Sequence, residues 1–240
     1  MISLRKTELR HREQRSRQVV WNTFDPQDRA DPFANGFGSL KNLSENLLPP
    51  NACASRQLCH QAELVTYVRQ GALAYEDSEG HSGVIHAGEF QRMTTTKTVR
   101  RSEINASRSR WAHIFRIWLR PTREGLTAGH ETKRFTTAER RGLLRVVASP
   151  DARRESLHLH KEVVIYSALL DPGQHVIHEL SPGRAAWLHL VGGQAILGDV
   201  LLAAGDSAGI MAEPAVSLTA REETEIMLLD LRQPSRDCRQ

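Results

Sequence analysis

The chain has 240 residues, of which 40% are hydrophobic and 25% are charged, and its formal net charge is +4. This composition is ordinary for a globular protein with one large or two small domains. No run of about 18 apolar residues is present, which excludes a transmembrane helix. Residues 1–20 lack the apolar core of a secretory signal peptide, so we expect a cytoplasmic protein with no membrane partner.

The basic charge is a weak indication of nucleic-acid binding. The arginines are scattered among 28 acidic residues, and only residues 5–17 form a basic cluster, with no aromatic residues between the charges. A solvated N-terminal strand or arm explains this pattern, so nucleic acid is not expected as a partner. The cysteines, Cys53, Cys59 and Cys238, are odd in number and form no CxxC pair, which argues against a disulfide framework.

In chain order, most segments are typical of short strands with turns between them. Alternating or β-branched residues followed by glycine or by Asp-Ser-Glu-Gly turn chemistry predict strands over residues 63–68, 71–75, 82–86, 89–94 and 111–119. A single helix is expected over residues 137–145, with Thr137 as its N-cap. The pattern therefore predicts an all-β protein with few short helices.

The second half of the chain repeats the first. The aligned pairs are residues 65–71 with 187–193, 84–90 with 201–207, and 118–120 with 230–232. Two similar β-rich halves predict two stacked antiparallel jelly-roll barrels. We expect the first barrel over residues 1–125, a connection over 126–150 and the second barrel over 151–240.

The turn with Ala-Gly-Glu at residues 87–89 follows an alternating hairpin, as in cupins, and the chain resembles the pirin family of two-cupin proteins. Four segments carry the resemblance: GFGSL and NLSE at residues 36–40 and 42–45, ELVTYV at 63–68, GVIHAGEFQRM at 83–93, and VRRSEIN at 99–105. The resemblance covers about residues 20–232. It implies that residues 1–125 are the pirin N-terminal domain.

The resemblance also implies a metal site, usually for iron, in the N-terminal barrel. Pirins bind the metal through three histidines and one glutamate, in the motifs HPHRDME and RHSEFN. Here the matching segments are QLCHQAE at residues 57–63 and RRSEIN at 100–105, so the ligand positions hold Gln57, Cys59, Arg101 and Glu103. Only Glu103 is retained. In the second barrel the matching positions, Glu179, Ser181 and residues 218–220, predict no metal site.

The substitution to arginine changes the chemistry of the pocket. An arginine stays protonated and has no lone pair for a metal. Residues two apart on a strand point to the same face, so Arg101 and Glu103 are expected to point together into the barrel. We therefore predict that Arg101 replaces the metal electrostatically and bonds Glu103, because a buried carboxylate requires a partner.

The role of Cys59 and the position of His60 each have two possible interpretations. Beside Arg101 the Cys59 thiolate would be favoured, which makes Cys59 a possible redox residue, whereas a buried free cysteine is usually inert. His60 would enter the pocket only through a one-residue slip that flips its neighbours, so a position at the rim or exterior is expected. Metal binding through Glu103, Cys59 or His60 is left open.

The favoured interpretation is a bicupin that has lost its metal site, has no cofactor and is non-catalytic. It would offer the pocket at Gln57, Cys59, Arg101 and Glu103 to a small anionic or aromatic ligand, or act as a regulatory protein with a protein partner. The alternative, which the resemblance implies, is a metal-dependent dioxygenase of the quercetin 2,3-dioxygenase type that uses iron or another divalent metal.

Overall fold

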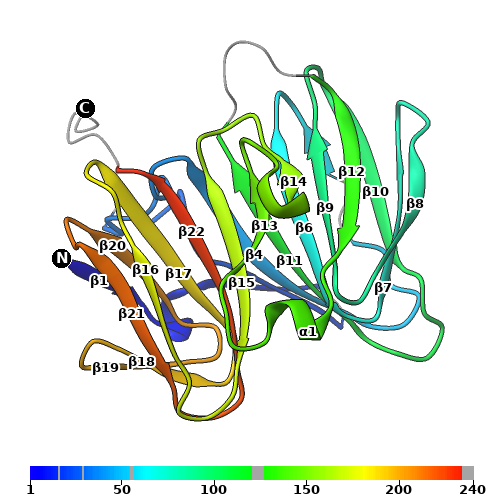
Figure 1. Ribbon diagram of the computed structural model, residues 1–240. Coiled ribbons are helices and arrows are strands. Elements are labelled where there is room, and N and C mark those ends of the chain that lie inside the picture. The colour runs from blue at the N-terminus through cyan, green and yellow to red at the C-terminus, as the bar shows by residue number, and fades with distance from the viewer. Residues whose placement is uncertain (16, 29, 55–56, 121–126, 234–240) are drawn as a thin grey trace. The chain divides into compact units, whose positions relative to one another are not determined.

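The computed structural model describes residues 1–15, 17–28, 30–54, 57–120 and 127–233 (Figure 1). Nearly all of its regular structure is β, and the only α-helix among these residues is α1 (Thr137–Arg140). The predicted all-β class is confirmed. None of the helices in the described ranges has the length and apolar character needed to cross a membrane.

The chain divides into two compact units. The N-terminal unit comprises His11–Gly36 and Leu40–Phe135, and the C-terminal unit comprises Met1–Arg10, Phe37–Ser39 and Thr136–Gln240. This grouping departs from simple sequence order, because the first ten residues belong with the second half of the chain. Among the described residues, each unit contains one seven-stranded and one four-stranded sheet.

The N-terminal unit is built from antiparallel strands. Its larger sheet has the order β12 (Gly129–Arg134), β9 (Glu89–Thr94), β6 (Glu63–Gln70), β11 (Ala112–Leu119), β4 (Leu40–Leu48), β3 (Gln18–Asn22) and β2 (His11–Arg15). Its smaller sheet has the order β5 (Gln57–Cys59), β10 (Val99–Asn105), β7 (Ala72–Asp77) and β8 (Ser82–His86). The predicted strands over residues 63–68, 82–86 and 89–94 lie within β6, β8 and β9.

The C-terminal unit has the same plan. Its larger sheet has the order β1 (Ile2–Arg5), β20 (Ser207–Met211), β17 (Arg184–Gly192), β22 (Thr224–Arg232), β15 (Val164–Leu170), β13 (Arg145–Ser149) and β14 (Leu157–His158). Its smaller sheet has the order β16 (His175–Glu179), β21 (Ala215–Ala220), β18 (Gln194–Leu197) and β19 (Val200–Ala203). Leucine, isoleucine, valine and alanine side chains of these strands form its buried core.

The internal repeat is visible in the strand order. β6 pairs with β11 and β9, as β17 pairs with β22 and β20. Each central strand is followed directly by a glycine with a φ of +80°, Gly71 in one unit and Gly193 in the other. A Cβ on Gly71 would lie 2.7 Å from the Trp111 carbonyl oxygen, and one on Gly193 would lie 2.3 Å from that of Glu223. Only glycine fits both the left-handed backbone and the close approach of the neighbouring chain.

The predicted helix over residues 137–145 is shorter than expected. It ends at Arg140, and residue 145 already begins β13. The N-cap is Thr136 rather than Thr137, because the Thr136 hydroxyl accepts a hydrogen bond from the Glu139 N–H while the Glu139 carboxylate accepts one from the Thr136 N–H. This reciprocal capping box fixes the start of the helix.

The basic segment at residues 5–17 is not a solvated arm throughout. β1 pairs with β20, and Arg5 and Arg10 are buried. Asp206 anchors the end of this strand: its carboxylate accepts hydrogen bonds from Lys6 Nζ at 2.8 Å and from the Thr7 N–H at 2.9 Å. Burial raises the pKa of Asp206, but the hydrogen bonds from Lys6 and the backbone outweigh burial, so the pKa lies below its ordinary value.

This anchor predicts a pH-dependent contribution to stability. Because the pKa of Asp206 is depressed in the folded state, its contribution is present above the ordinary aspartate pKa of about 3.9 and is lost as the pH falls through the folded value. Asp206→Asn should therefore lower the free energy of unfolding by about 1.5–3 kcal/mol at pH 7, the value of a hydrogen bond to a charged group. Urea unfolding at pH 7 and pH 3 should show this difference shrinking at the lower pH. An equal difference at both would contradict the assignment.

Candidate functional site

Arg101 and Glu103 lie side by side within the N-terminal unit, as the sequence predicts. Arg101 Nε donates to Glu103 Oε1 at 2.8 Å, and both side chains are almost fully buried. Arg101 Nη2 donates to Gln91 Oε1 at 2.7 Å, and Nη1 lies 3.4 Å from the sulfur of Met93. The guanidinium also lies over the ring of Tyr75, 4.1 Å from its centroid.

A second buried arginine shares the same carboxylate. Arg116 Nη2 donates to Glu103 Oε2, and Arg116 Nη1 donates to Asn46 Oδ1 at 2.6 Å. Burial raises the pKa of Glu103, but Arg116 and Arg101 outweigh it, so the pKa lies below the ordinary value. Glu103 is therefore a carboxylate held between two guanidinium groups, which we call the Arg101–Glu103–Arg116 triad.

Both carboxylate oxygens of Glu103 are engaged by arginines, and a guanidinium offers no lone pair to a cation. A cation at this point would also face two fixed positive charges. The predicted bond between Arg101 and Glu103 is confirmed.

Gln57 and Cys59 lie on β5, beside β10. Gln57 is the cross-strand partner of Arg101, and Cys59 that of Val99. Cys59 is fully buried and packs in an apolar cluster with Ala62, Leu64 and Met93. His60 is exposed and lies 2.8 Å from the Thr98 hydroxyl, in agreement with a rim or exterior position.

The surroundings of Cys59 predict an unreactive thiol. Burial raises its pKa to about 11, although Arg101 lowers it. Since the thiolate is the nucleophile, Cys59 should be alkylated by iodoacetamide at pH 7.5 at least about a hundredfold more slowly than an unperturbed thiol. The exposed Cys53 is the internal control, and labelling of each is followed by peptide mass spectrometry. Labelling of both at the same rate would contradict the prediction and support a redox role for Cys59. Cys238 lies outside the described residues.

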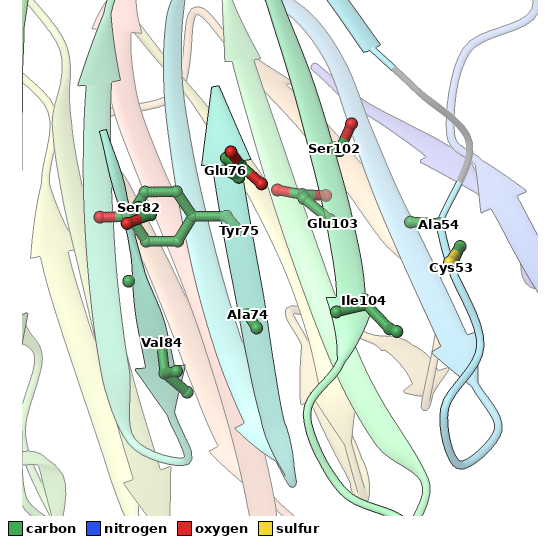
Figure 2. Close-up of a pocket in the computed structure, with 11 residues that line it drawn as sticks. Cys53, Ala54, Ala74, Tyr75, Glu76, Ser82, Val84, Ser102, Glu103 and Ile104 are labelled. Carbon is green, nitrogen blue, oxygen red and sulfur yellow. The ribbon is translucent and has the colours of Figure 1, made fainter. Parts of the chain in front are cut away.

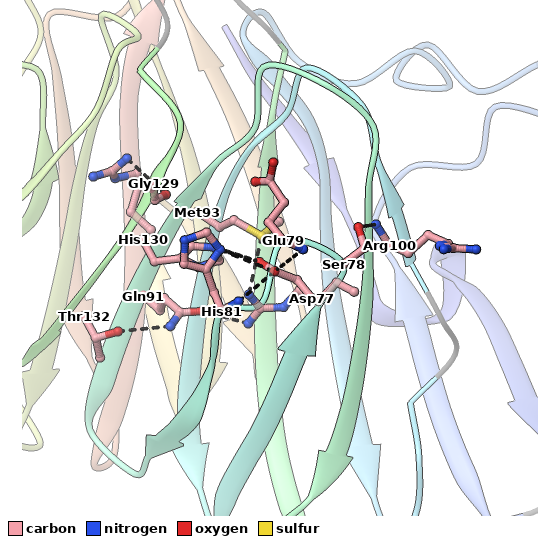
Figure 3. Close-up of polar contacts among 12 residues, drawn as sticks. Asp77, Ser78, Glu79, His81, Gln91, Met93, Arg100, Gly129, His130 and Thr132 are labelled. Atoms are coloured by element: carbon pink, nitrogen blue, oxygen red, sulfur yellow. Dashed lines mark hydrogen bonds and ion pairs between the residues drawn. The ribbon is translucent and has the colours of Figure 1, made fainter.

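A different set of potential ligands lies in the same unit, at Asp77, His81 and His130 (Figure 3). One ligand atom from each lies within 4.8 Å of the others. Asp77 Oδ2 is 3.2 Å from His81 Nδ1 and 3.0 Å from His130 Nε2. Asp77 is buried, His130 is half-buried and His81 is exposed, so this His-His-Asp group is open to solvent on one side.

Local structure holds Asp77 in place. It ends β7 and begins the turn to β8, where its Oδ1 accepts hydrogen bonds from the N–H groups of Glu79 and His81 at 2.9 and 3.0 Å. Burial raises the pKa of Asp77, but these backbone bonds and the two histidines outweigh it, so the pKa is lowered. The carboxylate is thus preorganised in its charged form.

His130 reaches Asp77 from another sheet. It lies on β12, opposite Met93 of β9. The Tyr75 ring stacks on its imidazole, with centroids 5.8 Å apart and planes 10° apart. Burial lowers the pKa of His130, and the charge of Arg101 lowers it further. His130 Nδ1 is buried and has no hydrogen-bond partner among the described residues.

Sequence reasoning missed this group. The pattern of residues 77–80 predicts only a turn, and residue 130 lies in the expected connection between the barrels. The available signal was the Asp77 and His81 spacing across a tight turn. The partner, His130, could not be found from local pattern, because the pairing of β12 with β9 joins segments about 40 residues apart.

The donor set of the His-His-Asp group fits a divalent transition metal. Two imidazoles and one carboxylate are the ligands of the facial triad in non-haem iron oxygenases, which leaves positions open for substrate. The buried and unpartnered Nδ1 of His130 gives this group a polar atom that the described protein does not satisfy. The Arg101–Glu103–Arg116 triad, by contrast, is internally paired.

A cavity of about 510 Å³ lies on the smaller sheet of the N-terminal unit (Figure 2). Side chains alternate along a strand, so Ser102 and Ile104 point to the face opposite Arg101 and Glu103. Cross-strand partners continue this face with Ala74 and Val84. The cavity is largely apolar, and of the predicted pocket residues only Glu103 contributes to its wall. Gln57 lines a different cavity of the same unit.

Comparison with known proteins places these features in a family. Residues 6–119 match the family model described as Pirin, and residues 146–231 match the Quercetinase C-terminal cupin domain. The chain is 30% identical over 231 residues to a quercetin 2,3-dioxygenase of Escherichia coli K12, covering 96% of this chain and 99% of that protein. It is 29% identical over 203 residues to a pirin-like protein of Caulobacter vibrioides, covering 83% and 86%.

Solved structures of bacterial relatives also resemble this chain over nearly its whole length. The chain is similar to YhhW of Escherichia coli, with a TM-score of 0.90 and 29% identity over 98% of this chain and all of that one. It is equally similar to the bacterial pirin YhhW of Escherichia coli in complex with nickel(II), with a TM-score of 0.89, 29% identity and the same coverage. The two-cupin fold predicted from the sequence is confirmed.

The predicted function requires correction. The interpretation as a non-catalytic ligand-binding or regulatory protein with a lost metal site is wrong, because quercetin 2,3-dioxygenase relatives match nearly the whole chain and a His-His-Asp group is present in the N-terminal unit. The fold, the two matched domain models and the near-full-length relatives lead to one conclusion: the chain belongs to the pirin family of two-cupin proteins.

Proposed function

We propose that this protein is a metal-dependent dioxygenase of the quercetin 2,3-dioxygenase type. The observation that carries the proposal is the match to a quercetin 2,3-dioxygenase over 96% of this chain, together with a donor set suited to a divalent metal. The His-His-Asp group of Asp77, His81 and His130 would hold the metal. Bound there, iron, nickel or another divalent metal would supply Lewis acidity and the capacity to use dioxygen.

Hydrogen bonds and ring stacking within this chain fix the positions of Asp77 and His130. Asp77 is fixed by two backbone hydrogen bonds before any ligand arrives. Tyr75 stacks on the His130 ring and is itself covered by the Arg101 guanidinium, so the imidazole plane has a fixed orientation. Such preorganisation lowers the cost of assembling a metal site. The exposure of His81 leaves one side of the group accessible to a substrate.

The proposal is tested by oxygen consumption with quercetin. Purified protein is stripped with a chelator and reloaded separately with iron(II), nickel(II) or copper(II). Quercetin-dependent oxygen uptake that requires one of these metals is expected. Uptake that is absent with every metal, or unaffected by chelation, would contradict the proposal.

We also propose that the protein is cytoplasmic and has a protein partner. Cell fractionation would test the location, and co-purification from a native extract would test the partner.

A further inference from the structure

A second cavity of the N-terminal unit, of about 430 Å³, differs from the one on the smaller sheet. It is lined by residues of β2, β3, β4, β5 and β11, including Val20, Asn46, Gln57, Arg116 and Trp118. Its volume is in the range of small-molecule sites. None of the residues of the His-His-Asp group lines it.

Arg116 is the charged group of this cavity. It is 1% exposed, and its two terminal nitrogens are engaged by Asn46 and Glu103. Its third donor, Nε, is buried and has no hydrogen-bond partner among the described residues. An unsatisfied buried donor of a charged group costs free energy, so an acceptor that reached this nitrogen would bind favourably.

The charges near the cavity are compatible with an anion. In the Arg101–Glu103–Arg116 triad, two guanidinium groups share one carboxylate. The buried Asp77 is the cross-strand partner of Arg101 and offsets charge on that side of the triad, so an anion at Arg116 would meet a guanidinium that shares its only bonded carboxylate with Arg101, away from water, where electrostatic interactions are strong. Glu13 also lines the cavity, but its side chain is 40% exposed and thus screened by solvent.

Gln57 supplies a second unpartnered polar atom. Its Oε1 is buried and has no hydrogen-bond partner among the described residues, although the residue lines the same cavity. Rotating the Gln57 side-chain amide by about 180° would place its NH₂ group where the oxygen now lies. An amide NH₂ group can donate a hydrogen bond to a carboxylate. The apolar part of the wall comes from Val20, Leu58 and the half-buried Trp118, which suit an aromatic ring.

We propose that this cavity binds a small aromatic carboxylate, with the carboxylate group at Arg116 and Gln57 and the ring against Trp118. The expectation of a small anionic or aromatic ligand is thereby assigned to a site next to the Arg101–Glu103–Arg116 triad. The site does not rest on the proposed dioxygenase activity, because none of its residues belongs to the His-His-Asp group.

Calorimetric titration of the metal-free full-length protein tests the proposal, with benzoate and its neutral analogue benzamide as probes. Benzoate should bind at least about tenfold more tightly than benzamide, since only benzoate brings a negative charge to the guanidinium, and a bond between two ionised groups is the stronger one. Equal affinity for the two probes, or no binding of benzoate at millimolar concentration, would overturn the proposal. Ordered water alone between Arg116 and Gln57, in crystals soaked with benzoate, would overturn it as well.

Two variants locate the site. Gln57→Glu places a like charge beside the ligand and should weaken benzoate binding at least about tenfold, and Gln57 is not part of the buried triad. Arg116→Gln should abolish the preference for benzoate over benzamide, provided that its circular dichroism is that of the parent. Val84→Ala, in the wall of the other cavity, is the matched control and should leave affinity unchanged. Unaltered benzoate affinity in Gln57→Glu would contradict the assignment.

Discussion

Asp77→Asn should remove high-affinity metal binding and, with it, metal-dependent turnover of quercetin. The amide keeps an oxygen that can accept the hydrogen bonds from the N–H groups of Glu79 and His81, so the turn should persist. It loses the negative charge that a divalent cation requires. Because changes to groups that merely support a ligand already cost about 10–100-fold in metal affinity, replacing the carboxylate ligand should cost at least about a hundredfold. Calorimetric titration with nickel(II) or iron(II) measures this.

Glu79→Gln is the control for that variant. Glu79 lies in the same turn, forms an ion pair with Lys97 and is outside the His-His-Asp group. It should bind metal and turn over quercetin like the parent chain. Parent-like metal affinity in Asp77→Asn, or an equal loss in Glu79→Gln, would show that the metal lies elsewhere.

Glu103→Gln should have the largest effect on stability. The carboxylate is buried between Arg101 and Arg116, and its removal leaves both guanidinium groups in the interior without the anion to which they are bonded. Breaking a buried ion pair by removing one partner costs about 3–5 kcal/mol. Urea unfolding followed by circular dichroism should show a decrease of this size in the free energy of unfolding of the N-terminal unit.

The matched control is Glu76→Gln on the adjacent strand. Glu76 is exposed and is the cross-strand partner of Ser102, on the opposite face of the sheet from Glu103. An exposed substitution of this kind should change stability by no more than about 0.5 kcal/mol. If Glu103→Gln were as stable as Glu76→Gln, the triad would contribute no net stabilisation and this account of it would be wrong.

The fold could be predicted from the sequence because its signals are local and repeated. Gly71 and Gly193 each follow a central strand, and each occupies a backbone position that excludes a side chain. The alternation of residues 99–105 correctly placed Arg101 and Glu103 on one face. Local pattern could not show that β1 belongs to the C-terminal unit, because its partner strand β20 lies about 200 residues away.

The candidate site was harder to predict because it depends on contacts between distant strands. Arg116 and Glu103 come from different sheets, and no spacing along the chain indicates that they meet. His130 falls in the predicted connection between the barrels, although it lies on β12 and approaches Asp77. The four aligned positions therefore predict the Arg101–Glu103 ion pair, but they give no indication of the His-His-Asp group, which carries the proposed chemistry.

X-ray diffraction at the absorption edge of a loaded metal tests the central claim most directly. Crystals of the protein loaded with nickel(II) or iron(II) should show one anomalous peak in the N-terminal unit, bound by Asp77, His81 and His130 at about 2.0–2.2 Å, as imidazole and carboxylate ligands bind transition metals. Glu103 should remain bonded to Arg101 and Arg116. A peak at Glu103 and Cys59, or no peak near Asp77, would contradict the account.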